Sequence, residues 1–230
     1  MRINKKIFLI ACFVFVFGSL FSQISENQKL LRVKLWVPID ENPQFGIPFN
    51  SDDGLYSSAM TSLKNVAPYI LSSMIYGWNF EYTPSDKTRN VEEFFSLELL
   101  AKISREDSNI NFVDFSSLDT RFYAWLQYPR TEEMMISRER WNSIKFPKVK
   151  GYGESSALKS DEAIIEAIND AAKNAIRTYA QTQTKNKPKE VLGKIILVDQ
   201  DISVKIHKGK YTAYLDFFLY VDKIIQYSQF

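Results

Sequence analysis

Cysteine and histidine are almost absent from this 230-residue chain, which has one residue of each type. A lone Cys cannot form a disulfide within the chain, so a disulfide scaffold is excluded. A zinc site built from Cys and His is excluded as well, because such a site needs four ligands. Catalysis by a Ser–His or Cys–His pair would have to use His207 or Cys12, so most nucleophilic enzyme classes are excluded.

Glycine and proline are also scarce, with 8 residues each, whereas the chain has 17 Phe, 12 Tyr and 4 Trp. Collagen-like and disordered chains have the opposite composition. The sequence therefore predicts an ordinary folded protein with an aromatic-rich core.

The first 22 residues have the pattern of a secretory signal peptide. Three basic residues within positions 1–6 precede an uncharged apolar run at 7–21, and the small residue Ser22 follows. The run of 15 residues is short for a permanent membrane span, which needs about 20. Cys12 lies inside the run rather than at the cleavage point, so a lipid anchor is not expected. The alternative is an uncleaved amino-terminal anchor.

Removal of this leader changes the charge balance of the chain. The whole chain has 29 basic and 27 acidic residues, and without the three basic residues of the leader it has 26 against 27. The predicted mature chain is therefore slightly acidic, free of Cys and without the basic excess that nucleic-acid binding requires. We expect a periplasmic or outer-membrane-associated protein with no nucleic-acid partner and no integral membrane span after leader removal.

Hydrophobic periodicity predicts secondary structure along most of the mature chain. Three- and four-residue spacing predicts three helices: one that starts at Leu55, stops at Gly77 and is kinked or split by Pro68, one at 131–144, and one from Ser160 to the KNKPK at 185–189. Apolar alternation predicts strands at 29–37, 78–84, 92–103, 110–115, 121–128, 148–155, 193–199, 201–206 and 211–221.

These elements predict an α+β fold, with mixed or antiparallel sheets packed against helices. We expect the signal peptide at 1–22, an amino-terminal α+β unit at 23–146 and a carboxy-terminal strand–helix–strand–hairpin unit at 147–230. Both halves have the order strand, helix, strand, strand. Duplication and two unrelated α+β units are both consistent with that order.

Two motifs that resemble catalytic or cofactor sites have simpler interpretations. The GYGES at 151–155 lacks the third Gly of a dinucleotide-binding fingerprint, and we interpret it as a tight turn between elements. His207 lies between lysines in a predicted hairpin, which favours an exposed turn residue. We therefore predict no catalytic, cofactor-binding or metal-binding residues and no cofactor.

Carboxylate pairs offer an alternative, because glycoside hydrolysis needs neither His nor Cys. Four acids lie near aromatic segments that contain Trp78 and Trp125: Glu81, Asp86, Asp114 and Asp119. Their spacing selects no pair. A carboxylate-dependent hydrolase of envelope glycans stays an alternative, as does a small-ligand or lipid carrier with an apolar cavity between sheet and helices.

The aromatic residues of the first two thirds of the chain mainly predict core packing. Trp36 differs, because strand alternation places it on the same face as Arg32 and Lys34. We expect these three residues to form a partly exposed contact surface for an envelope protein or a second copy of the chain.

The segment GYGESSALKSDEAIIEAINDAAKNAIRTYA at 151–180 resembles the start of a small envelope domain. Such domains occur in bacterial outer-membrane lipoproteins and at the amino terminus of flagellar assembly protein T. The residues that carry the resemblance are Ala163, Ala167, Asp170, Ala171, Asn174, Ala175 and Ile176, and residues 148–221 are the part of the chain it covers. The chain departs from the lipoproteins by lacking their Cys.

The resemblance implies a non-catalytic envelope or motility-associated module. Together with the leader and the scarcity of catalytic residue types, it leads us to expect an exported protein that acts by binding or assembly.

Overall fold

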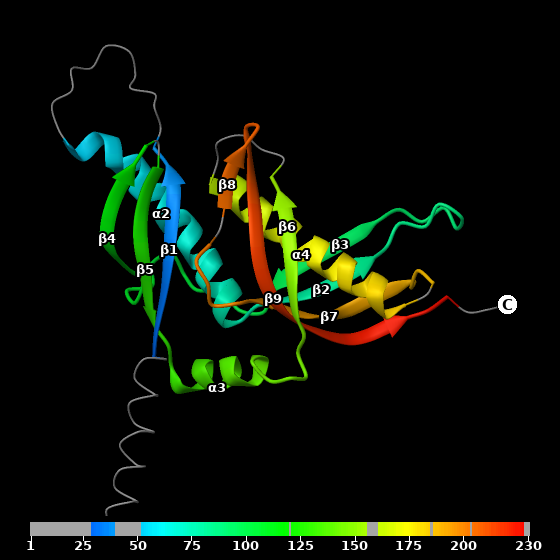
Figure 1. Cartoon of the computed structure of the whole chain (residues 1–230). Helices are drawn as coiled ribbons and strands as arrows, with labels where there is room; N and C mark the ends of the chain where they lie inside the picture. Colours follow the sequence, from blue (N-terminus) through cyan, green and yellow to red (C-terminus); the bar gives the residue numbers. More distant parts are fainter. Residues whose placement is uncertain are drawn as a thin grey trace, which may run out of the picture.

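The computed structural model of the chain describes residues 29–39, 52–119, 121–155, 161–184, 186–202 and 204–227 (Figure 1). The predicted signal peptide and Ser160, the predicted start of the third helix, lie outside the described residues. No helix within the described residues has the length and apolar content needed to cross a membrane.

The described residues form three helices and nine strands, which confirms the predicted α+β class. The helices are α2 (Asp52–Ile75), α3 (Glu132–Trp141) and α4 (Asp161–Gln183). The strands are β1 (Leu30–Pro38), β2 (Trp78–Thr83), β3 (Phe94–Leu99), β4 (Asn111–Leu118), β5 (Arg121–Pro129), β6 (Lys148–Glu154), β7 (Glu190–Leu197), β8 (Val204–His207) and β9 (Lys210–Ile225).

The strands form two antiparallel sheets. The three-stranded sheet has the order β1-β5-β4. The six-stranded sheet has the order β3-β2-β7-β9-β6, and β8 also pairs with β9. The 16-residue β9 therefore bonds β6 along one edge and both β7 and β8 along the other.

The six-stranded sheet takes strands from both sides of residue 146. β2 and β3 come from the predicted unit 23–146, and β2 pairs directly with β7 of the unit 147–230. The strand–helix–strand–strand order occurs in both halves, but the pairing differs. β6 and β7 both flank β9, whereas β1 pairs with β5 and not with β2 or β3.

Helix α2 runs without interruption through Pro68, so the helix is not split there. Proline removes one backbone donor from a helix, but the turns on both sides of Pro68 are packed in the core, where Leu63, Val66 and Leu71 are buried. The predicted stop at Gly77 is confirmed. Its φ is +74°, and its backbone N–H donates to the Ser72 carbonyl oxygen at 3.0 Å, as in a left-handed helix cap.

The interpretation of GYGES as a tight turn is wrong, because β6 continues through Glu154. Gly151 and Gly153 instead allow α4 to lie against β6. A Cβ on Gly153 would lie 2.1 Å from the Ala171 backbone nitrogen, and one on Gly151 would lie 2.1 Å from the Ala171 oxygen. The pattern Gly-x-Gly alone does not distinguish a turn from such a close helix–strand contact.

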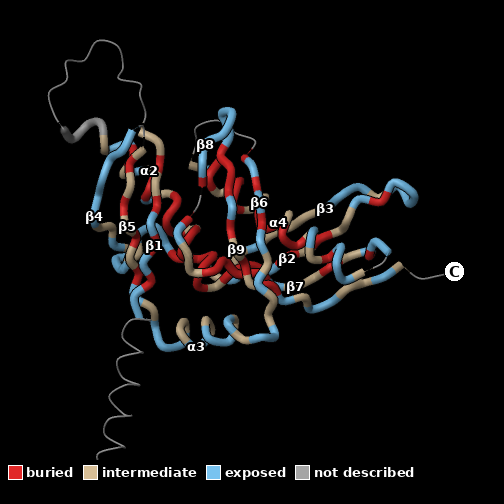
Figure 2. Tube along the Cα trace, in the orientation of Figure 1, coloured by how far each residue is buried: buried red, intermediate tan, exposed pale blue. Residues whose placement is uncertain are grey.

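Both sheets share one core, in which α2 and α4 are in contact (Figure 2). The Tyr69 hydroxyl on α2 donates to the Asn169 amide oxygen on α4 and accepts a 3.1 Å hydrogen bond from Trp78 Nε1. Helix α3, in contrast, has no buried residue, as its pale trace in Figure 2 shows. Two sheet faces are exposed to solvent: the face of the three-stranded sheet that carries Arg32 and Lys34, and the face of the six-stranded sheet that carries Asn79 and Lys194.

Candidate functional site

The outer face of the three-stranded sheet carries an alternation of cationic and aromatic side chains, which we call the cation–aromatic face. It consists of Arg32, Lys34 and Trp36 on β1 and of Arg121, Tyr123 and Trp125 on β5. Strand alternation produces it, because the intervening residues, such as Val33 and Ala124, are buried against the core. The antiparallel register places Lys34 opposite Trp125 and Trp36 opposite Tyr123.

Each cation of this face lies over an aromatic ring of the neighbouring strand. The guanidinium carbon of Arg32 is 4.4 Å from the Trp125 ring centroid, and that of Arg121 is 4.5 Å from the Trp36 centroid. The Lys34 ammonium is 5.1 Å from the Tyr123 centroid. Such stacks are worth about 0.5–1 kcal/mol each at exposed sites and hold long side chains in one place.

The structure places the three predicted contact residues on one face, but Trp36 also has an internal role. Its indole Nε1 donates to the Val204 carbonyl oxygen on β8 at 3.0 Å, and its ring packs against Tyr211 at 6.1 Å. Arg32 forms an exposed ion pair with Asp114 at 2.5 Å. Trp36 therefore ties the two sheets together, while the cations and the rings on β5 face solvent.

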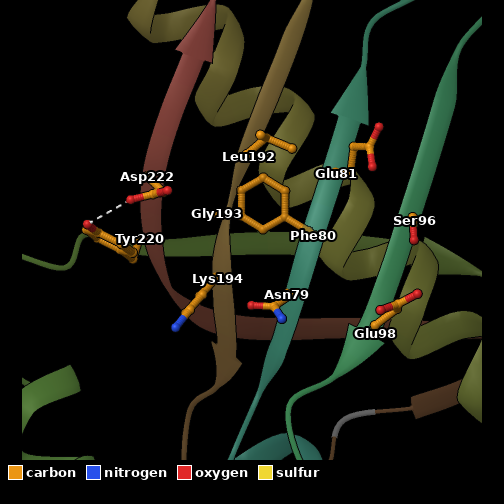
Figure 3. Close-up of a pocket in the computed structure, with 10 residues that line it drawn as sticks. All are labelled: Asn79, Phe80, Glu81, Ser96, Glu98, Leu192, Gly193, Lys194, Tyr220 and Asp222. Carbon is orange, nitrogen blue, oxygen red and sulfur yellow. Dashed lines mark hydrogen bonds between the residues drawn. The ribbon is translucent and has the colours of Figure 1, made fainter.

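The second open surface is a trough on the six-stranded sheet, on the side away from α4 (Figure 3). Its volume is about 560 Å³. The lining residues come from β2, β3, β7 and β9: Asn79, Phe80, Glu81, Ser96, Glu98, Leu192, Gly193, Lys194, Tyr220 and Asp222. Three carboxyl groups and one ammonium group thus line a polar trough.

One carboxyl group of the trough has a perturbed pKa. A side-chain hydrogen bond with the Glu190 carboxyl raises the pKa of Glu81, and partial loss of hydration and the Glu190 charge act in the same direction. Glu190 begins β7, one strand away from Glu81 in the same sheet. Two carboxyl groups that share a hydrogen bond favour retention of one proton between them.

Of the four acids proposed from the sequence, only Glu81 lines the trough. Asp86 is buried in a turn, where Arg89 lowers its pKa by a side-chain hydrogen bond. Asp114 pairs with Arg32 in the other sheet, and Asp119 lies in the left-handed region with a φ of +52°. The structure does not bring these four acids together, and no group of three His, Cys, Asp or Glu within the described residues could hold a metal ion.

The two tryptophans of the aromatic segments near these acids also lie apart from the trough. Trp78 is fully buried, because the alternation that exposes Asn79 and Glu81 turns Trp78 inward. Trp125 belongs to the cation–aromatic face. His207 is exposed at the end of β8, as predicted.

Several residues that line these two surfaces were not predicted as site residues from the sequence. Glu98, Lys194, Tyr220 and Asp222 lie on three different strands, and Arg121 joins Trp36 only through pairing of β1 with β5. Asp222 also lies beyond the predicted strand 211–221. Only the register between strands places them next to one another.

A protein-family model matches residues 19–227, about nine-tenths of the chain. The chain belongs to this family. The family's matched region includes both sheets, the cation–aromatic face and the trough. The chain is also similar to an uncharacterized protein of Treponema pallidum (strain Nichols), with 22% identity over 198 residues, which is 86% of this chain and 82% of the relative. No solved structure gives a significant match to the chain.

Proposed function

We propose that the chain is an exported, non-catalytic envelope protein that acts by binding or assembly, in the periplasm or at the outer membrane. The cation–aromatic face is its contact surface for an envelope protein or a second copy of the chain. The predicted leader and the resemblance of residues 148–221 to envelope domains support the location. The observation that carries the binding function is the stacking of three cations on three rings.

This face has the composition of an interaction surface. Arg, Tyr and Trp are enriched at the centres of protein interfaces, and these residues contribute most of the binding energy there. The stacked cations are already held in place, so binding would cost them little side-chain entropy. Of the three stacked cations, Arg32 alone forms an ion pair with another described residue. Lys34 and Arg121 are therefore available for acidic groups of a binding protein.

Charge reversal tests the proposed surface. We expect the double variant Lys34→Glu and Arg121→Glu to lose its partner in crosslinking within cells. The matched control carries the same charge change at Lys102→Glu and Lys150→Glu, two exposed lysines outside this face. Loss of the same crosslinks in the control, or their persistence in the double variant, would contradict this contact surface. A wild-type protein that is monomeric and recovers no partner would contradict binding as its function.

A carboxylate-dependent glycan hydrolase is the second candidate. The raised pKa of Glu81 favours a protonated acid, and Glu98 and Asp222 line the same trough. Release of reducing ends from envelope glycans, lost in the variant Glu98→Gln, would support this candidate over a non-catalytic protein.

A lipid carrier needs an apolar cavity, and the space between β1, α2 and α4 has a volume of about 10 Å³. Leu35, Leu63, Val66, Ile164 and Val204 are among the side chains that line it. A space of this size is close to the minimum for one water molecule. It gives no support to a carrier function.

A further inference from the structure

We propose that the trough on the six-stranded sheet is a binding site for a short, neutral oligosaccharide. This site is separate from the cation–aromatic face, so the inference does not depend on the proposed protein partner. Binding here requires no cleavage of the ligand. Four observations carry the proposal: the size of the trough, the way its floor is built, its free polar groups and its charge.

The trough has the size of a small-ligand site. Its volume of about 560 Å³ lies within the range of roughly 300–1,000 Å³ that is typical of such sites. Figure 3 shows side chains of β2, β3, β7 and β9 around the opening, so four neighbouring strands contribute to it.

The floor of the trough depends on a bulge and a glycine in β7. The pairing of β7 with β9 shifts register between Leu192 and Gly193. A Cβ on Gly193 would lie 2.1 Å from the Tyr220 carbonyl oxygen and 2.8 Å from the Phe80 ring, so no other residue fits without movement of the backbone. The bulge increases local twist, and Phe80 and Leu192 give the floor an apolar part.

Polar groups of the lining are available to a ligand. Asn79, Ser96, Glu98 and Lys194 form no side-chain hydrogen bond or ion pair with the rest of the described chain. Lys194 supplies only donors and Glu98 only acceptors, while Asn79 and Ser96 supply both. A sugar hydroxyl also donates and accepts, so a ring of hydroxyls could satisfy this mixture. Tyr220, which is 39% exposed, lies at the edge of the trough, where its ring packs against Phe146 at a centroid distance of 5.6 Å.

The charge of the trough selects among sugars. Even with Glu81 protonated, the carboxylates of Glu98 and Asp222 outnumber the single ammonium of Lys194, so the lining repels a sugar that carries carboxylate or phosphate groups. The protonated form of the Glu81 carboxyl can also donate a hydrogen bond, which suits a hydroxyl better than a cation. These features favour a neutral ligand.

Calorimetric titration of the full chain tests the proposal with three probes: chitotriose as a neutral sugar, trigalacturonate as an anionic sugar and spermidine as a cation. We expect chitotriose to bind, and trigalacturonate to bind at least about tenfold more weakly because of charge repulsion. The variants Glu98→Ala and Lys194→Ala should each weaken chitotriose binding roughly tenfold, as expected for loss of a charge-assisted hydrogen bond.

Matched controls separate this site from others. Glu139→Ala and Lys150→Ala remove the same residue types at exposed positions outside the trough and should leave the affinity unchanged. The double variant Lys34→Glu and Arg121→Glu should also bind chitotriose normally, whatever its effect on crosslinked partners. The proposal is overturned if chitotriose does not bind, if spermidine binds in its place, or if the folded trough variants bind as tightly as the wild type.

Discussion

At the scale of single residues, ion pairs join segments that are far apart in the sequence. Arg177 of α4 donates to both carboxyl oxygens of Glu93, which lies just before β3. Asp199, just after β7, pairs with Arg130 and lies 3.6 Å from Arg138 of α3. The arginines that pair with Asp199 are more buried than Arg177, so loss of the Asp199 pairs should lower the free energy of unfolding by more than loss of the Glu93–Arg177 pair.

The Glu93–Arg177 pair should make stability depend on pH. The hydrogen bond from Arg177 lowers the pKa of Glu93 below its ordinary value of 4.5. The pair therefore contributes at pH values above about 4.5, and its contribution is lost as the pH falls through the folded-state pKa. We expect Glu93→Gln to lower the free energy of unfolding by about 1 kcal/mol at pH 7, since both side chains are partly exposed.

Urea unfolding of wild type and Glu93→Gln at several pH values checks this expectation. The difference between the two proteins should shrink as the pH falls below about 4.5 and the carboxylate becomes protonated. A difference that stays constant from pH 7 to pH 3 would show that the ionised Glu93 carboxylate does not stabilise the fold.

The Asp199 cluster should be much more sensitive to mutation than an exposed pair. The side chains of Arg130 and Arg138 are only 8% and 11% exposed, so Asp199→Ala leaves two largely buried cations without a counter-charge. We expect the free energy of unfolding, measured with urea at pH 7, to fall by about 3 kcal/mol. The control Asp114→Ala breaks the exposed pair with Arg32 and should cost at most about 1 kcal/mol. Equal losses in the two variants would contradict the role of burial.

At the scale of elements, the alanine stripe of α4 and the two glycines of β6 form one close contact. Ala163, Ala167 and Ala171 are fully buried, and the backbone of α4 lies within reach of any side-chain atom on Gly151 or Gly153. The helix therefore approaches the sheet more closely than larger residues would allow. Gly151 and Gly153 both lie against the backbone of Ala171, and Gly153 also lies against that of Ala167.

Gly153→Ala should weaken this contact strongly. The added Cβ would meet backbone atoms of Ala167 and Ala171, which cannot rotate away as a side chain can. We expect the free energy of unfolding, measured by thermal unfolding, to fall by about 2 kcal/mol or more, as in other overpacked cores. Lys150→Ala on the same strand points to solvent and should change stability by less than about 0.5 kcal/mol. A neutral effect of Gly153→Ala would contradict the close packing of α4 on β6.

At the scale of the whole molecule, the two sheets share a core, and specific contacts join them. Leu35 of the small sheet and Val204 of the large one line the same small space, and the indole of Trp36 bonds the backbone of β8. Strands β2 and β3 also belong to the large sheet, although they precede β4 and β5 in the chain. These connections favour unfolding of the two sheets as one cooperative unit.

Native-state hydrogen exchange checks this cooperativity. We expect amides in the centres of β5 and β9 to exchange with the same opening free energy, because neither sheet can lose its core without the other. Trp36→Phe removes the hydrogen bond to β8 and should lower both values together by about 1 kcal/mol. Exchange of β5 at a clearly lower free energy than β9 would instead support the separate units 23–146 and 147–230.

The sequence predicted the elements well and their neighbours poorly. Alternation within 29–37 and 121–128 identified β1 and β5, but no local pattern records that Trp36 lies opposite Tyr123, which is 87 positions away. For the same reason Glu81 was a candidate acid from the sequence, while Glu98 and Asp222 were not. The misread Gly151 shows the other limit, because the need for glycine came from a helix that packs on β6.

The long strand β9 has a consequence for the order in which the fold can be completed. It is the central bonding partner of β6, β7 and β8, and it follows all three in the chain. A chain that leaves the ribosome or an export channel amino-terminus first cannot complete the strand pairing of the large sheet until residues 210–225 emerge. Until then the backbone of Ile195, Ile196 and Leu197 on β7 has no β9 strand to pair with, although these side chains are buried in the folded protein. Folding should therefore be late and slow relative to synthesis, since its final step joins segments far apart in sequence.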